Sequence, residues 1–261
     1  MTTNFLETIT PLILTYNESP NIGRTLECLK WAKTIVVIDS FSNDQTLEIL
    51  ASYSQVEVFQ RKFDTHTVQW NYGLEQIDSD WILSLDADYV LSAEIIKEIQ
   101  SMFKLEDSQL FDAYFAPFRY CVFGKPLRAT ILPPRQVLFR KSRAIYIDDG
   151  HTQLLQVHGK SGSLKSYINH DDRKPLSRWL WAQDRYMKIE SQKLLDTPSN
   201  QLGFADRLRK QKVFAPIVIL VYCLIFKGGI LDGWAGWYYA WQRMLAEILL
   251  AIRLIELEQT R

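Results

Sequence analysis

The chain has 261 residues, 47% of them hydrophobic, and its formal net charge is zero. This composition is globular rather than disordered, and the length suits one large domain or one domain with a smaller appendage. The absence of a basic excess argues against a nucleic-acid partner. Cys28, Cys121 and Cys223 are scattered and form no CxxC pair, which favours buried thiols in a reducing compartment over a thiolate metal site.

The N-terminal segment has neither a basic n-region nor a small-residue cleavage site, so we expect no signal peptide. The first hundred residues then alternate two patterns. Apolar, β-branched runs predict strands at 9–17, 34–40, 56–61 and 81–85. Apolar residues at helical spacing predict helices at 21–32, 42–53 and 67–77, with Ser42 and Asn43 expected as caps of the second.

Strands joined by helices of this length predict an α/β fold, in which a mostly parallel sheet has helices on both faces. Ligands bind such sheets at the carboxyl ends of the strands. Asn17, Asp39 and Asp86 all follow predicted strands at that end. We therefore expect a ligand site where these three residues converge.

The middle of the chain is less regular. Residues 112–124 and 135–142 have strand-like composition, and residues 151–170 are typical of a hairpin. Further on, Asp171 and Asp172 fit a linker that precedes a long helix.

The C-terminal part begins with a basic cluster, followed by the uncharged 14-residue run 213–226 and an aromatic group. The run is shorter than the roughly 20 residues of a spanning helix. This combination favours a segment that lies in a membrane interface. A helical subdomain packed on the core or on a second copy of the chain, and a re-entrant or hairpin insertion, stay open. The aromatic group comprises Trp234, Trp237, Tyr238, Tyr239 and Trp241.

The segment "DWILSLDADYVLS" places two carboxylates, Asp86 and Asp88, directly after a buried strand. Neighbouring carboxylates repel each other and are costly to desolvate, so a cation is expected beside them. In an extended segment, residues i and i+2 point to the same side. We therefore expect both acids to face one divalent cation, Mg²⁺ or Mn²⁺, in a site that leaves room for phosphate oxygens.

These motifs carry a family resemblance. "PLILTYNESPNIGRTLECLKWAKTIVVIDSFSNDQTLEIL" and "QWNYGLEQIDSDWILSLDADYVLS" resemble family-2 glycosyltransferases with the GT-A fold over roughly residues 8–100. The similarity is closest to the branch containing lipopolysaccharide core glucosyltransferases. The tail phrase "GGILDGWAGWYYAW" is also similar to that branch.

The resemblance implies roles for individual residues. Thr15, Tyr16, Asn17 and Glu18 match a loop that borders the nucleotide, and Asp39 matches an acid that binds the base or ribose. Asp86 and Asp88 match the metal-binding acids, whose cation bridges the donor's diphosphate as it leaves. Gln69 and Asn71 match a polar pair near the donor.

Three positions depart from the family pattern, one of them Thr152, which stands where relatives of this branch have Glu after the predicted base. Many relatives have a basic residue where this chain has Trp70, and Arg61 or Lys62 is the alternative source of positive charge. Relatives often place Glu directly after the second acid, where this chain has Tyr89.

An inverting transfer needs a carboxylate base for the acceptor hydroxyl. By resemblance we favour Asp149 as this base, with Asp148 next. His151 or His170 would complete the metal shell. Arg135 and Arg178 are candidates for contact with the diphosphate or the acceptor, and the sequence does not decide between them.

The sequence as a whole predicts a GT-A catalytic domain at 1–175, with a donor-nucleotide half at 1–100 and an acceptor half at 101–175. A helical, membrane-associating region is expected at 176–261. The predicted activity is inverting, metal-dependent transfer from a nucleoside-diphosphate sugar, with a UDP-linked sugar expected, to a glycolipid, lipopolysaccharide-core or other cell-envelope acceptor. It would take place at the cytoplasmic face of the cell membrane. A catalytically impaired binding protein and a nucleotidyltransferase are the alternatives.

Overall fold

The computed structural model describes residues 5–102, 110–149 and 152–260. The chain divides into two compact units, which are described separately. Unit 1 comprises residues 1–123 and 132–173, and unit 2 comprises residues 124–131 and 174–261. The short segment 124–131 belongs with the C-terminal helices.

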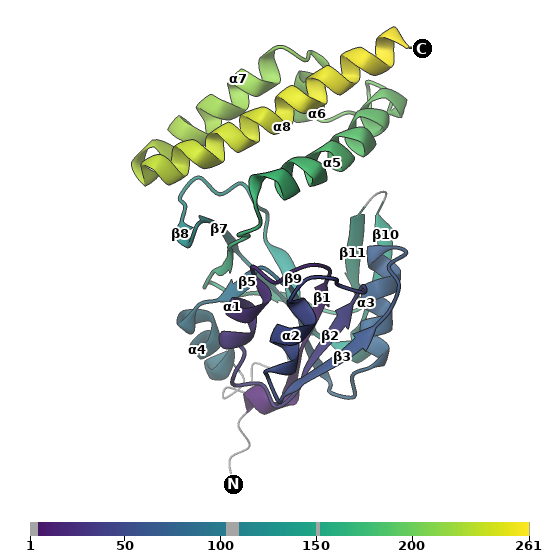
Figure 1. Cartoon of the computed structure of the whole chain (residues 1–261), viewed down its shortest axis with the longest axis vertical. Coiled ribbons are helices and arrows are strands. Elements are labelled where there is room, and N and C mark those ends of the chain that lie inside the picture. The colour runs from purple at the N-terminus through teal and green to yellow at the C-terminus, as the bar shows by residue number, and fades with distance from the viewer. Residues whose placement is uncertain (1–4, 103–109, 150–151, 261) are drawn as a thin grey trace. The chain divides into compact units, whose positions relative to one another are not determined.

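Unit 1 is an α/β unit whose first hundred residues alternate strands and helices (Figure 1). Its strands are β1 (Ile9–Thr15), β2 (Ile35–Asp39), β3 (Val56–Gln60), β4 (Trp81–Asp86), β5 (Tyr89–Leu91), β6 (Ala113–Ala116), β7 (Phe118–Val122), β9 (Arg135–Arg140), β10 (Ala144–Asp149), β11 (Thr152–Val157), β12 (Ser161–Ser163) and β13 (Ile168–His170). Its helices are η1 (Phe5–Thr8), α1 (Ile22–Glu27), α2 (Thr46–Ala51), α3 (His66–Glu75), α4 (Ala93–Met102) and η3 (Lys141–Arg143).

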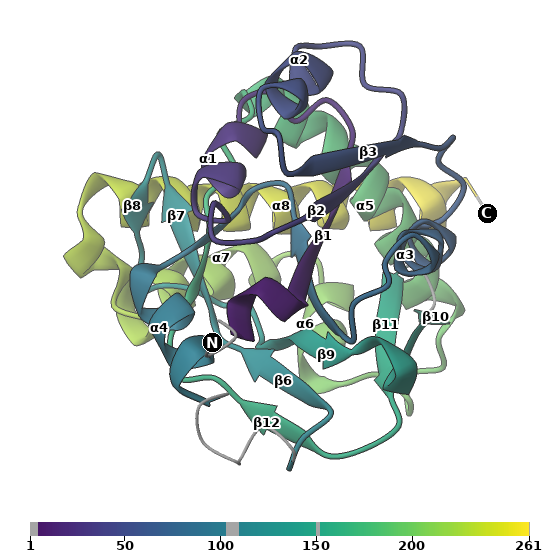
Figure 2. The ribbon, with the colours of Figure 1, turned by 90° about the horizontal axis from the view of Figure 1, so that it is seen from below.

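The central sheet has seven strands in the order β12-β6-β9-β4-β1-β2-β3. β1 pairs in parallel with both β2 and β4, and β2 pairs in parallel with β3. β9 is antiparallel to its neighbours β4 and β6. β6, β9 and β12 are labelled in Figure 2. The prediction of a mostly parallel sheet is confirmed for the strands β1, β2, β3 and β4.

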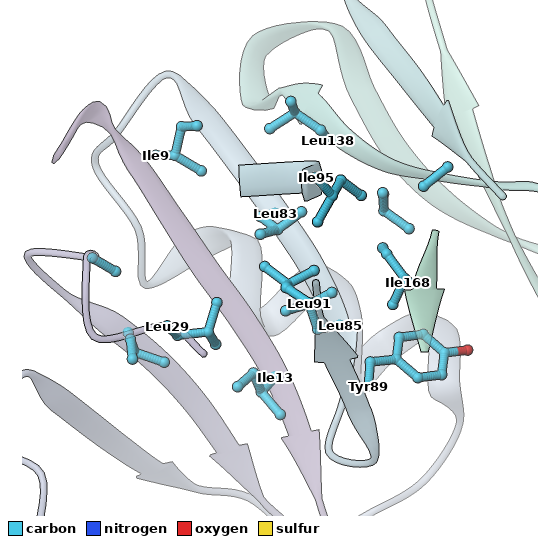
Figure 3. Packing of buried hydrophobic residues seen from close by; sticks show 14 of the residues in the cluster. Ile9, Ile13, Leu29, Leu83, Leu85, Tyr89, Leu91, Ile95, Leu138 and Ile168 are labelled. Atoms are coloured by element: carbon cyan, nitrogen blue, oxygen red, sulfur yellow. The ribbon is translucent and has the colours of Figure 1, made fainter. Parts of the chain in front are cut away.

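Alternating side chains along these strands build a core on each face of the sheet. Ile13, Val37 and Leu83 belong to one buried cluster, which also includes side chains of α1 and α4 (Figure 3). Leu12 and Ile82 belong to a second cluster, with Trp70 and Leu74 of α3. Because successive strand residues point to opposite faces, strands that are buried on both faces read as continuous apolar runs.

The structure corrects the hairpin predicted at 151–170. β11 pairs with β10, which precedes it in the chain. β12 instead pairs with β6, and β13 lies between β5 and β7 in a smaller sheet. The predicted helix at 21–32 is also shorter, since α1 ends at Glu27, although Leu29 beyond its end is fully buried.

Unit 2 is mainly helical. It contains β8 (Lys125–Pro126), α5 (Leu176–Asp196), α6 (Phe204–Lys210), α7 (Phe214–Val221), η4 (Tyr222–Phe226), η5 (Gly229–Asp232) and α8 (Trp234–Gln259). The buried Asp232 carboxylate accepts hydrogen bonds from the backbone N–H groups of Arg128 and Ala129, at 2.7 and 3.4 Å. These bonds attach the segment 124–131 to the helices.

Arg209 of the predicted basic cluster is an internal ion-pair partner. Its guanidinium donates to the buried Glu247 carboxylate of α8 at 2.9 Å. Across residues 5–102, 110–149 and 152–260, the structure contains no helix that combines the length and the apolar character needed to cross a membrane.

Candidate functional site

Three strand ends meet at one edge of the central sheet. Thr15, the last residue of β1, is in register with Asp39, the last residue of β2. Asp86, the last residue of β4, is in register with Leu14 of β1. The segments that follow these ends therefore leave the sheet side by side, as expected for a ligand site of an open parallel sheet.

Asp39 is fully buried and its carboxylate is occupied by protein donors. It accepts hydrogen bonds from the Thr15 hydroxyl at 3.0 Å and from the Ser42 backbone N–H at 2.8 Å. The Ser42 hydroxyl and the Gln60 amide donate at 2.5 and 3.4 Å. Asp39 therefore organises the loop after β2, and its predicted contact with a base or ribose would require one of these donors to move.

The loop at residues 15–18 is joined to the loop at 42–46. The Asn17 backbone N–H donates to the Ser42 hydroxyl at 2.8 Å, and the Asn43 N–H donates to the Asn17 side-chain oxygen at 2.9 Å. The Glu18 N–H donates to the Thr46 hydroxyl at 2.8 Å. Tyr16, whose side chain is exposed, lies between these anchored residues. The two loops thus form one continuous rim.

These contacts correct the expectation that Ser42 and Asn43 cap the second helix. α2 begins at Thr46 and its N-cap is Gln45. Ser42 and Asn43 instead bind Asn17 across the rim. Ser, Asn and Asp are favoured both as caps and in turns, so local sequence does not separate the two roles.

Gln69 and Asn71 are engaged within the protein. Gln69 is fully buried and donates to the Ser40 hydroxyl at 3.0 Å, while its oxygen accepts from Arg61 at 2.6 Å. The Asn71 amide exchanges two hydrogen bonds with the backbone of Tyr146, at 2.8 and 3.0 Å. In this structure both amides hold neighbouring segments, and their contact with a donor stays a prediction.

Trp70 and Arg61 also have structural partners. The Trp70 ring is buried and stacks on Tyr146 with centroids 5.2 Å apart. Arg61 pairs with Asp64 at 2.8 Å as well as with Gln69. The position that is basic in many relatives is therefore part of the core here, and Arg61 already has an acidic partner.

Asp86 and Asp88 lie at the end of β4 and in the turn that follows it. β4 ends at Asp86, residues 87–88 form the turn, and β5 begins at Tyr89. The expectation of an extended segment was wrong, because residues 87–88 form a turn, and the expectation that both acids face one cation stays a prediction. Asp86 is partly exposed, whereas Asp88 is 9% exposed. Both carboxylates nevertheless lie close enough to Tyr89 to raise its pKa.

Tyr89 and Arg135 surround the exposed acid. The Arg135 guanidinium donates to the Tyr89 hydroxyl at 3.0 Å and lies 3.8 Å from the Asp86 carboxylate. Burial raises the pKa of Tyr89 well above its usual value of 10, and the Asp86 and Asp88 charges add to this effect. The hydroxyl therefore stays protonated and serves as a hydrogen-bonding group.

His170 faces the buried acid. Its Nε2 lies 3.1 Å from the Asp88 carboxylate. Burial acts to lower the pKa of His170, but the Asp88 and Asp86 charges outweigh it, so the pKa lies above 6.5. Tyr89 and Tyr120 pack their rings against the imidazole at 5.4 and 5.0 Å. Of the predicted metal ligands, the structure thus places His170 against Asp88, with Asp86 near enough for its charge to act on the imidazole.

The chemical types of these three side chains suit a divalent cation. Two carboxylates and an imidazole are ligands that Mn²⁺ accepts, and carboxylates suit Mg²⁺. The buried Nδ1 of His170 has no hydrogen-bond partner among the described residues. Within that part of the chain, however, no three His, Cys, Asp or Glu side chains are gathered as a ready metal cluster. A cation would need further oxygens, such as those of a diphosphate.

A polar network around Asn21, not recognised in the sequence, supports this edge. The buried Asn21 amide donates to the Glu18 and Asp172 carboxylates, both at 2.9 Å. Arg24 donates to the buried Asp171 carboxylate at 2.6 Å. Asp171 and Asp172, predicted as a linker, therefore join the loop at 15–18 to the strand that carries His170.

The turn between the acids is held from α1. The Thr25 hydroxyl donates to the Ala87 carbonyl at 2.7 Å, and both groups are buried. The Asp171 backbone N–H donates to the Asp88 carbonyl at 3.0 Å. The backbone of the acidic turn is thus fixed on both sides.

The predicted base lies at the end of β10. Asp148 is in this strand, and its side chain is exposed. The backbone of Asp149 ends the strand, but its side chain and the whole of His151 lie outside what the structure describes. Arg178 belongs to unit 2, where its guanidinium lies over the Trp181 ring at 4.3 Å.

Comparison with known proteins shows the family of the region that contains these loops and acids. The sequence profile of glycosyl transferase family 2 matches residues 12–172, which is more than half of the chain. The chain belongs to glycosyl transferase family 2. The matched region contains the rim, both acids of the turn and His170.

Curated relatives cover part of this family-2 chain. An uncharacterised glycosyltransferase of Rickettsia felis is 29% identical over 133 residues, which are 44% of this chain and 47% of the relative. The glycosyltransferase SunS of Bacillus subtilis is 31% identical over 114 residues, 42% of this chain and 27% of SunS. The chain spans about half or less of the length of these relatives.

Solved structures support a GT-A-like fold. Residues 1–349 of Staphylococcus aureus TarS, in complex with UDP-GlcNAc, superpose with a TM-score of 0.52 at 14% identity, covering 97% of this chain and 92% of that fragment. The Pyrobaculum calidifontis mannosyltransferase PcManGT, in complex with GDP-Man and Mn²⁺, superposes with a TM-score of 0.54 at 12% identity. The match covers 95% of this chain and 87% of PcManGT. At these identities the likeness concerns the fold alone.

Proposed function

We propose that this protein transfers a sugar, with inversion, from a nucleoside-diphosphate sugar to a glycolipid, lipopolysaccharide-core or other cell-envelope acceptor. A UDP-linked donor is the expected one. One observation carries the proposal: the rim, formed by the loops at 15–18 and 42–46, meets Asp39 and the acidic turn at one edge of the sheet. TarS with UDP-GlcNAc and PcManGT with GDP-Man support a nucleotide-sugar donor.

Asp86 and Asp88 would hold Mg²⁺ or Mn²⁺ together with the donor's diphosphate, with His170 as a further ligand. When bound, such a cation supplies positive charge that stabilises the leaving diphosphate. Only a neutral imidazole binds metal, and the raised pKa of His170 makes loss of its proton harder. The network of Asn21 and Thr25 fixes the backbone around these ligands.

On the acceptor side, Asp149 or Asp148 would take the proton of the attacking hydroxyl. The acceptor oxygen forms a bond to the anomeric carbon as the bond from that carbon to the diphosphate oxygen breaks. The electron pair of the broken bond stays on the diphosphate. Attack from the face opposite the leaving group inverts the anomeric centre.

Unit 2 would bind the protein peripherally to the cytoplasmic face of the cell membrane. An apolar stripe on the outside of α7 and η4 repeats at helical spacing and is 40–77% exposed: Phe214, Ile217, Val218, Val221, Tyr222, Ile225 and Phe226. Trp234, Trp237 and Trp241 of α8 are also exposed. Exposed aromatic and aliphatic side chains of this kind suit the boundary between headgroups and acyl chains.

Two lysines beside this surface suit anionic lipid headgroups. The Lys227 ammonium lies 5.7 Å from the Tyr222 ring, and that of Lys125 lies 5.9 Å from the Trp234 ring. Cations beside an apolar surface favour a negatively charged membrane over an uncharged partner. A surface-bound enzyme would meet a lipid-linked acceptor directly.

The proposed activity is tested with the full chain, UDP-sugars and either Mg²⁺ or Mn²⁺. We expect release of UDP, and we expect Asp88→Ala to abolish it. Asp78→Asn, an exposed acid outside the site, is the control and should keep full activity. Binding without turnover would favour a catalytically impaired binding protein, and pyrophosphate release from a nucleoside triphosphate would favour a nucleotidyltransferase.

A further inference from the structure

Arg135 is the first residue of β9, the antiparallel neighbour of β4. Its guanidinium lies 3.0 Å from the Tyr89 hydroxyl and 3.8 Å from the Asp86 carboxylate. It also lies over the Phe118 ring, 6.0 Å from the centroid. β9 therefore places a permanent positive charge beside Asp86 at the end of β4, because arginine is not deprotonated in proteins.

Tyr89 fixes this arginine in place. Its ring is 5% exposed and packs 4.8 Å from Phe118, inside the larger apolar cluster. Figure 3 shows the ring within that cluster and the hydroxyl at its margin. The hydroxyl accepts from Arg135 and is hydrogen-bonded to Asp86. A buried ring with a single polar tip is a rigid support for a flexible side chain.

Arg135 still has capacity for a ligand. Its side chain is 51% exposed, and its contact with Asp86 is longer than a hydrogen bond. Two other arginines of this unit are more fully engaged: Arg24 binds Asp171 at 2.6 Å, and Arg61 binds both Asp64 and Gln69. The planar guanidinium presents five N–H donors, which suit the bidentate recognition of phosphate oxygens.

We infer that Arg135, positioned by Tyr89, binds the diphosphate of the donor and stabilises its negative charge as the sugar leaves. The inference rests on the proposed function. It also bears on two of the departures from the family pattern. Trp70, in place of a basic residue, belongs to the core, and Tyr89 follows the acidic turn as the support of a cation that comes from β9.

The test is calorimetric titration of the full chain with UDP and, separately, with uridine, in EDTA and in Mn²⁺. We expect Arg135→Gln to raise the Kd for UDP by about tenfold or more in both media, because charge-assisted hydrogen bonds are lost. The Kd for uridine, which has no phosphate, should not change. Arg135→Lys should restore part of the affinity, and Tyr89→Phe should weaken UDP binding with its ring packing retained.

Arg143→Gln is the control, because Arg143 is an exposed arginine beyond the far end of β9. Unchanged UDP affinity in Arg135→Gln, with wild type binding UDP, would overturn the inference and leave the proposed function standing. Equal loss of UDP and uridine binding would also overturn it, since that indicates a structural role. If the wild-type chain binds no nucleoside diphosphate in Mn²⁺, the proposed function itself fails.

Discussion

At the scale of single residues, Phe41 stands out for its backbone. Its φ is 60°, in the left-handed region, and its side chain is 55% exposed beside the Asp39 loop. Bulky residues rarely adopt this conformation, and holding one there costs about 1–3 kcal/mol. The hydrogen bonds from Asn17 and Asn43 hold the rim in this shape despite the cost.

Phe41→Gly is expected to stabilise the protein by about 1 kcal/mol, because glycine adopts a positive φ without steric strain. The measurement is urea denaturation of the two proteins. Phe41→Ala is the control, since it removes the ring but keeps the Cβ atom. Equal stability of the glycine and alanine variants would show that the backbone at this position is not strained.

The sequence predicted residue types at the site better than their contacts. The acidic turn and the loop at 15–18 were recognised from short patterns. The partners of Asp39, Gln69 and Asn71 were not, because those side chains bind residues that lie outside the patterns. A pattern shows that a polar residue is required, but whether it meets a ligand or another part of the chain depends on tertiary packing.

At the scale of elements, local patterns sufficed for the strands of the parallel sheet and failed for the short strands after it. β1, β2 and β4 are almost wholly buried, and a strand that is buried on both faces needs a continuous apolar run, which is visible in the sequence. β12 and β13 have three residues each and pair with strands about 50 residues away. Such pairing leaves no local signal, so the predicted hairpin was wrong.

The glycine-rich phrase in unit 2 has a packing role. A Cβ atom on Gly236 of α8 would lie 1.9 Å from the Gly229 carbonyl oxygen of η5. Glycine at this position therefore allows the helix to approach the backbone of η5 closely. This contact accounts for part of a motif that the sequence alone linked only to a family.

Gly236→Ala is expected to destabilise unit 2 by about 3 kcal/mol, since the added methyl group meets rigid backbone. Urea denaturation and limited proteolysis of the 174–260 helices would measure this change. Gly203→Ser is the control, because open space surrounds a Cβ atom at that position, and its effect should stay below about 0.5 kcal/mol. Similar effects of both substitutions would contradict the packing role.

At the scale of the whole molecule, the two units carry different parts of the proposed function. Unit 1 contains the acidic turn, the rim and His170, and unit 2 contains the exposed apolar stripe. Composition alone indicated that the tail differs from the rest of the chain. It did not show that segment 124–131 belongs with the tail, because that depends on the hydrogen bonds to Asp232.

Replacement of Ile225 and Phe226 together by serine is expected to weaken binding to vesicles of anionic phospholipid by at least about tenfold. The side chains are 61% and 77% exposed, and apolar side chains that enter a bilayer each contribute about 1.5–3 kcal/mol when fully buried. Vesicle sedimentation measures the binding. Ile252→Ser, on an exposed part of α8, should bind as the wild type does, and unchanged binding of the double variant would contradict the membrane role.

The central claim is that the acidic turn binds a nucleoside diphosphate together with a divalent cation. Titration of the full chain with UDP in Mn²⁺ and in EDTA, for the wild type, Asp86→Asn and Asp88→Asn, tests it most directly. We predict binding that Mn²⁺ strengthens in the wild type, and loss of that Mn²⁺-dependent gain in both variants. Binding of Mn²⁺ and UDP that is equally tight in all three proteins would contradict the claim.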